Sequence, residues 1–135
     1  MPEQFLFVYG TLRNGSGIPQ QRLLRMHADL LGDARINAVM FDLGGYPGII
    51  LSNDAADYVK GELYALRPEH QATLLAELDE YEECTSRFIE PHEFRRELVS
   101  VQLEHNCANM NAWVYLYNRT PEAAARITNG DYRKS

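Results

Sequence analysis

The chain has 135 residues, of which 45% are hydrophobic, and its 19 acidic and 13 basic side chains give a formal net charge of −6 at pH 7. This length suits a single domain over residues 1–135, and the apolar content excludes a disordered polymer. The acidic balance argues against a protein that binds nucleic acid, because such binding depends on basic side chains that neutralise phosphates.

The first part of the chain predicts a buried strand, a loop and a short helix. Residues 5–9 form a continuous apolar and aromatic run, which is typical of a strand buried on both faces. Residues 11–17 contain two glycines and predict a loop. Pro19 can open a helix that ends near His27, because proline is favoured at the first helical position.

The next part predicts short strands that are interrupted by glycines. The strand-like pieces are residues 30–31, 36–41 and 49–51, and the glycine-rich segment 44–48 between the last two predicts a turn. Residues 58–66 alternate between apolar and polar side chains and predict a further strand.

The second half predicts one long helix and two more strands. The helix is expected over residues 68–83, the strands over 94–103 and 112–117, and a helical turn after Pro121. Strands dominate and the two helices are inserted at separate points, without the regular alternation of a doubly wound fold. We therefore predict an α+β fold with a small mixed, barrel-like sheet.

Targeting and redox signals are negative. The amino-terminal residues carry an acid where a signal peptide carries positive charge, and no segment approaches the ~20 apolar residues of a membrane helix. Cys84 and Cys107 lack CxxC spacing and are expected to be free thiols, with Cys84 more plausible as a structural residue than as a nucleophile. A cytoplasmic protein without membrane contact is expected.

The long helix places one carboxyl group on its apolar face. With Leu74 at the origin and about 100° per residue, the apolar arc contains Leu75, Leu78 and Tyr81. Glu82 falls between Leu75 and Leu78. Burial would raise the pKa of this carboxyl group and suit it to general acid–base catalysis. The alternative is a frayed last turn that lets Glu82 reach solvent.

Four other acids surround this position in the sequence. Glu77, Asp79, Glu80 and Glu83 all fall outside the apolar arc, so we expect them to be solvated. Their negative charges would raise the pKa of Glu82 further.

A second candidate site follows the first strand. The turn Tyr9, Gly10, Thr11, Leu12 and Arg13 can direct main-chain N–H groups at one point, as in sites for phosphate, carboxylate or an oxyanion. The sequence lacks the lysine of a phosphate-binding P-loop and the glycine spacing of a dinucleotide site. Its four histidines are scattered, which gives little support for a metal site.

Tyr115 is a third candidate. Strand alternation places it on the same sheet face as Tyr117, so its hydroxyl could enter a pocket, although packing in the core is the more common role.

Eight short segments, taken together and in order, resemble the gamma-glutamylcyclotransferase-like family, including its gamma-glutamylamine cyclotransferase branch. Each segment is short, but their order and spacing make the resemblance specific, and they extend over nearly the whole chain. They are residues 7–13, 31–34, 45–48, 59–64, 78–82, 94–96, 112–115 and 130–132.

The resemblance implies a small mixed barrel with a cavity at one end and an activity that needs no metal or other cofactor. The implied reaction converts a small gamma-glutamyl amine or peptide to 5-oxoproline and a free amine. The implied general acid and base is Glu82. The turn at residues 9–12, with Arg13 beside it, would bind the substrate and stabilise the oxyanion.

Two residues depart from the family pattern. Glu83 stands where the family often has glycine, and Phe94 stands where a tyrosine is common. The connection over residues 83–93 is long and could be a lid or an ordinary loop. The alternatives to an enzyme are a non-catalytic module that binds a small anionic molecule in the same cavity, or a protein-interaction domain.

Overall fold

The computed structural model describes residues 3–10, 19–85, 88, 90–119, 125–127 and 130–131. This part of the chain contains eight strands and two helices. In chain order they are β1 (Gln4–Val8), α1 (Pro19–His27), β2 (Ala28–Ile36), β3 (Ala38–Asp42), β4 (Pro47–Leu51), β5 (Val59–Leu66), α2 (Gln71–Tyr81), β6 (Phe94–Leu103), β7 (Asn109–Tyr117) and β8 (Ala125–Ile127).

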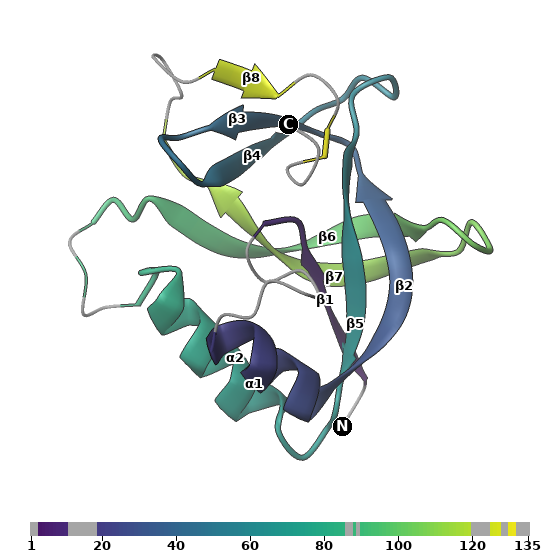
Figure 1. Cartoon of the computed structure of the whole chain (residues 1–135), viewed down its shortest axis with the longest axis vertical. Helices are drawn as coiled ribbons and strands as arrows, with labels where there is room; N and C mark the ends of the chain where they lie inside the picture. The colour runs from purple at the N-terminus through teal and green to yellow at the C-terminus, as the bar shows by residue number, and fades with distance from the viewer. Residues whose placement is uncertain are drawn as a thin grey trace.

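Five of the strands close into a barrel in the order β1-β5-β2-β6-β7 (Figure 1). Neighbouring strands are antiparallel except β1 and β7, which close the barrel as a parallel pair in register at Leu6 and Trp113. A separate three-stranded sheet has the order β4-β3-β8. In Figure 1 the two helices lie together on one side of the barrel and the small sheet lies at the opposite end. The predicted α+β fold with a mixed barrel is therefore correct.

Strand β1 separates two hydrophobic cores because its side chains alternate between its faces. Phe7 and Tyr9 pack inside the barrel. Leu6 and Val8 pack on the other face, among residues of the two helices that include Leu24. The continuous apolar run in the sequence is thus a strand buried on both faces, as predicted.

Strand β5 lies beside β1 and requires a glycine at the point of closest approach. A Cβ atom at Gly61 would lie 2.2 Å from the main-chain oxygen of Val8 and 2.6 Å from the Phe7 ring. No side chain fits there, so Gly61 allows the carboxyl end of β1, where the candidate site begins, to lie against β5.

The structure confirms several predicted elements. Helix α1 has the predicted bounds, as does β6, and β5 differs from its predicted range by one residue. Helix α2 begins three residues later than expected, because residues 68–70 form a turn. Leu74, Leu75 and Leu78 are buried, as the helical periodicity predicted.

Other predictions were wrong. Residues 30–31 and residue 36 were predicted to lie in separate strands, but both belong to the nine-residue strand β2. This strand continues through a bulge between Leu30 and Gly32, and the φ of Gly32 is 143°. The expected helical turn after Pro121 is wrong over residues 125–127, which form β8 and pair with β3. The predicted loop at residues 11–17 lies outside the described residues. Neither described helix is long and apolar enough to span a membrane.

Candidate active site

A cavity of about 380 Å³ opens beside the carboxyl ends of β1 and α2. This volume is in the range of small-molecule sites. The cavity combines apolar and aromatic walls with three carboxyl groups. Its lining residues are Phe7, Val8, Tyr9, Gly10, Tyr46, Pro47, Tyr81, Glu82, Glu83, Glu93, Phe94 and Tyr115.

Glu82 is the residue that directly follows α2, and it lines this cavity. The helix end is hydrogen-bonded rather than frayed. Glu83 has a left-handed conformation, with φ of 57°, and its N–H donates to the Glu80 oxygen over 3.1 Å. The N–H of Cys84 donates to the Asp79 oxygen over 3.0 Å. These two bonds form the Schellman motif that commonly ends helices, and they fix the backbone on both sides of Glu82.

The environment of Glu82 raises the pKa of its carboxyl group from 4.5 to about 7. Burial is the largest cause, followed by the negative charges of Glu93, Asp79 and Glu83. Both effects disfavour the charged form, as expected from the position of Glu82 in the apolar arc. At neutral pH this group can therefore both accept and donate a proton.

The periodicity predicted that Tyr81 is buried, and this prediction was wrong. Its side chain is 37% exposed, because α2 ends at this residue and its ring borders the open cavity.

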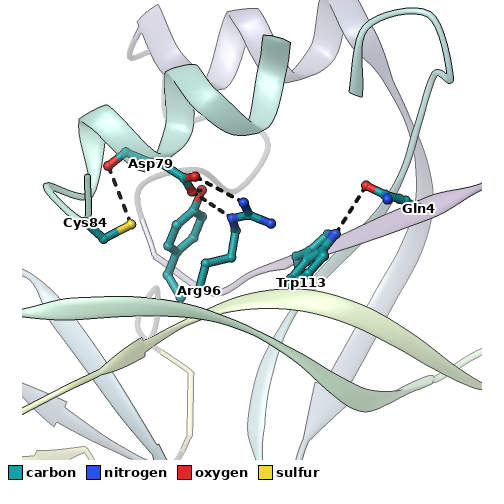
Figure 2. Close-up of polar contacts among 6 residues, drawn as sticks. Gln4, Asp79, Cys84, Arg96 and Trp113 are labelled. Atoms are coloured by element: carbon teal, nitrogen blue, oxygen red, sulfur yellow. Dashed lines mark hydrogen bonds and ion pairs between the residues drawn. The ribbon is translucent and has the colours of Figure 1, made fainter. Parts of the chain in front are cut away.

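Asp79 was expected to be solvated, and this prediction was wrong. Its carboxylate forms a two-point ion pair with Arg96, with distances of 2.8 Å to Nε and 3.1 Å to Nη2 (Figure 2). The hydroxyl of Tyr115 also donates to Asp79 Oδ1, over 2.7 Å. Helical periodicity cannot reveal these partners, because they come from β6 and β7.

Tyr9 and Tyr115 both line the cavity and are joined to each other. The buried Tyr9 hydroxyl donates to the main-chain oxygen of Tyr115 over 2.6 Å. Burial raises the pKa of Tyr9 well above its ordinary value, and the negative charge of Glu82 raises it further. Both tyrosines were predicted as binding residues, and the cavity brings them together with Glu82.

Gly10 forms part of the cavity wall beside Pro47. A Cβ atom at Gly10 would lie 2.9 Å from Cγ of Pro47, so a larger residue would displace the proline. The other three residues of the predicted turn, Thr11, Leu12 and Arg13, lie outside the described residues.

Tyr46 and Glu93 also line the cavity, although no role at the site was predicted for either residue. The Tyr46 hydroxyl donates to Glu93 Oε2, and this bond raises the pKa of Tyr46 to about 12. The Tyr46 ring also lies 6.3 Å from the Phe94 ring, measured between centroids. The sequence marked Tyr46 as part of a turn and gave no signal for Glu93. Both ends of the long connection, Glu83 and Glu93, thus border the cavity.

The cysteines are free, and Cys84 is not set up as a nucleophile. Burial and the charges of Asp79 and Glu82 raise the pKa of the Cys84 thiol to about 12, whereas a reactive thiol needs a lowered pKa. Among the described residues, no three metal-binding side chains are grouped together.

Comparison with known proteins gives a consistent result. The family model described as gamma-glutamyl cyclotransferase, AIG2-like, matches residues 6–134. The gamma-glutamylcyclotransferase family protein YtfP of Escherichia coli is 33% identical over 128 residues, which are 94% of each chain. Its solution structure superposes with a TM-score of 0.63, covering 98% of this chain and all of that one. The gamma-L-glutamyl-butirosin B gamma-glutamyl cyclotransferase of Niallia circulans is 31% identical over 127 residues, 92% of this chain and 73% of that one.

Proposed function

The chain belongs to the gamma-glutamylcyclotransferase family, and from this premise we propose that its cavity converts a small gamma-glutamyl amine or peptide to 5-oxoproline and a free amine, with Glu82 as general acid and base. The family supports a cyclotransferase-like enzyme that acts on gamma-glutamyl substrates. The residue roles and the amine that is released are the proposed part.

The observation that carries the proposal is the carboxyl group of Glu82, which lines the cavity with a pKa raised to about 7. A general acid–base group works best when its pKa lies near the working pH. A carboxyl group with an ordinary pKa would be almost entirely ionised at pH 7 and would be a poor proton donor.

The reaction needs positioning and proton transfer more than it needs a reactive cofactor. The α-amine of the gamma-glutamyl group attacks the side-chain carbonyl carbon of the same group, forming the C–N bond of a five-membered lactam. The C–N bond to the leaving amine then breaks. Because the nucleophile is part of the substrate, holding the substrate in a bent conformation supplies much of the rate.

Glu82 would carry a proton between the two nitrogens. Its carboxylate accepts a proton from the substrate α-ammonium and returns it to the departing nitrogen as the C–N bond breaks. The second proton lost by the attacking nitrogen passes to the released amine through solvent. The main-chain N–H groups that follow β1 are proposed to stabilise the oxyanion, as in other acyl transfers.

The test is release of 5-oxoproline from a panel of gamma-glutamyl amines and peptides. Wild type should turn over at least one compound, and Glu82→Gln should lower kcat by about 10²- to 10⁴-fold, the range for loss of a general acid–base group. Glu77→Gln, which changes an exposed acid on the same helix, is the matched control and should keep full activity.

Two outcomes would contradict the proposal. Full turnover by Glu82→Gln would remove Glu82 from its role. Thermal stabilisation by gamma-glutamyl compounds without any product would favour the non-catalytic binding module instead.

A further inference from the structure

We propose that Asp79 is the positioning residue of this site: its carboxylate, bound by Arg96 and Tyr115, holds the end of α2 against the barrel and thereby directs the Glu82 carboxyl group into the cavity. The proposal rests on the proposed role of Glu82. Asp79 itself is absent from the cavity lining, so it would act through its neighbours and not through the substrate.

The side chain of Asp79 is held by two residues of the barrel wall. Arg96 on β6 and Tyr115 on β7 are directly opposed in the antiparallel ladder, so their side chains reach Asp79 from adjacent strands. The Arg96–Asp79 pair is largely buried, with 23% and 18% of the two side chains exposed. A two-point pair between a guanidinium and a carboxylate fixes orientation as well as distance.

The main chain of Asp79 is held as well. Its carbonyl oxygen accepts the Cys84 N–H over 3.0 Å, and Cys84 Sγ lies 3.6 Å from the same atom (Figure 2). Residues 79 and 84 are therefore the two ends of the turn that contains Glu82. Because the Asp79 side chain is bound to the barrel and its main chain closes the turn, a shift of Asp79 must move Glu82.

Arg96 is itself held by an aromatic residue of β7. Its guanidinium lies over the Trp113 ring, 4.4 Å from the ring centroid. The Trp113 indole N–H donates to Gln4 Oε1 over 3.3 Å, which connects this arrangement to β1 (Figure 2). A lysine would keep the charge at this position but would lose both the two-point pair and the planar stacking.

Tyr115 connects Asp79 to Tyr9, which lines the cavity after β1. Its hydroxyl donates to Asp79 and its main-chain oxygen accepts the Tyr9 hydroxyl, so one residue orients both the end of α2 and the end of β1. The relative position of Glu82 and the turn at residues 9–10 thus depends on the Asp79–Tyr115 bond.

Kinetics can separate positioning from simple structural support. Arg96→Lys and Tyr115→Phe should each lower kcat by about 10-fold or more while KM changes much less, because a small displacement of a catalytic group costs up to about 10²-fold. Arg95→Gln is the matched control, since Arg95 is the exposed neighbour that binds Glu97 and Asn118 outside the site. Its activity should equal that of wild type.

A second measurement does not require turnover. The ionisation of Glu82 can be followed by carboxyl carbon NMR, with the resonance assigned by its loss in Glu82→Gln. The charged and titratable groups that surround Glu82 are Asp79, Glu83 and Cys84 at the end of α2, Glu93 before β6, and Tyr9 after β1. Asp79→Asn should lower the midpoint of Glu82, and Arg96→Lys should change both its chemical shift and its midpoint.

The outcomes separate this inference from the proposed function. If Arg96→Lys and Tyr115→Phe only lower Tm, with kcat and the Glu82 titration unchanged well below that temperature, Asp79 is a structural anchor and the proposal is wrong. If no gamma-glutamyl compound is turned over by wild type but the Glu82 titration responds as expected, the positioning role stands and the proposed reaction fails.

Discussion

Glu93 and Glu82 line the same cavity, and the negative charge of Glu93 is, after burial, the largest cause of the raised pKa of Glu82. The two residues come from segments that the sequence separates by ten residues, one at the end of α2 and the other immediately before β6. A negative charge beside a carboxyl group disfavours its ionisation, so Glu82 keeps its proton at a higher pH than it would without Glu93.

Removal of the second charge should move the pH dependence of catalysis. In wild type, kcat/KM should rise with pH through a midpoint near the Glu82 pKa of about 7, because the base must be ionised to accept the substrate proton. Glu93→Gln should lower this midpoint, since it removes a charge that opposes ionisation of Glu82. The measurement is a pH–rate profile, with Glu97→Gln as the control, because Glu97 is a half-exposed acid of β6 that pairs with Arg95. An unchanged midpoint in Glu93→Gln would contradict the electrostatic coupling.

Stability should also depend on the protonation of Glu82. Its pKa in the folded protein, about 7, is above the ordinary value of 4.5, so the folded state binds the proton more tightly than the unfolded state. Its contribution to the free energy of unfolding is therefore complete below about pH 4.5 and is lost as pH rises through about 7. Glu82→Gln should be more stable than wild type at pH 8 by about 1–3 kcal/mol, and the difference should shrink towards pH 4.5. Denaturant unfolding at both pH values measures this, and a pH-independent difference would contradict it.

Glu83→Gly should stabilise the protein. Glu83 has a φ of 57°, a left-handed conformation in which a side chain is strained and glycine is favoured at a helix end. Allowing for the greater freedom of glycine in the unfolded chain, the expected gain is about 0.5–1 kcal/mol in denaturant unfolding. Glu83→Ala separates the two effects, because it removes the charge beside Glu82 but keeps the strain. Equal stability of the two variants would show that the backbone conformation is not the cause.

Gly61→Ala should destabilise the barrel strongly. The added Cβ atom would lie 2.2 Å from the Val8 main-chain oxygen, so β1 and β5 would have to separate. Overpacking of a core costs about 1–3 kcal/mol, and here the obstructing atom is backbone and cannot rotate away. Gly44→Ala is a useful comparison for space alone, since nothing lies within 4 Å of a Cβ atom there, although its φ of 105° adds local strain. Equal stability of Gly61→Ala and wild type would be incompatible with the observed strand pairing.

The fold class and the place of Glu82 on the apolar face of the helix could be predicted from the sequence. The residues that surround Glu82 could not. Periodicity works for Leu74, Leu75 and Leu78 because this part of the helix face packs against the core, whereas Tyr81 at the end of the same face is exposed. It fails for Asp79, because the partner that buries it is an arginine 17 residues later in the chain. The distance between Glu93 and the end of α2 depends likewise on how the connection folds back to β6, and no local pattern encodes that.

Glycine patterns were also ambiguous without the structure. The prediction divided one strand into two at Gly32, because a glycine within an apolar segment is as typical of a turn as of a bulge. In the barrel the strand continues through it, with a change of register against β5. The three-residue strand β8 has too few residues to show alternation, and its pairing with β3 depends on tertiary contacts.

The parallel closure of the barrel explains why space for a small molecule exists at this end. Strands β1 and β7 are in register at Leu6 and Trp113, and within two residues further along both strands the chain lines the cavity, with Phe7 and Val8 on β1 and Tyr115 on β7. There the Tyr9 hydroxyl reaches the Tyr115 carbonyl oxygen. A side chain spans a wider gap than a ladder bond does, so extending the pairing of β1 and β7 by two residues would bring their ends together and reduce the space for a ligand.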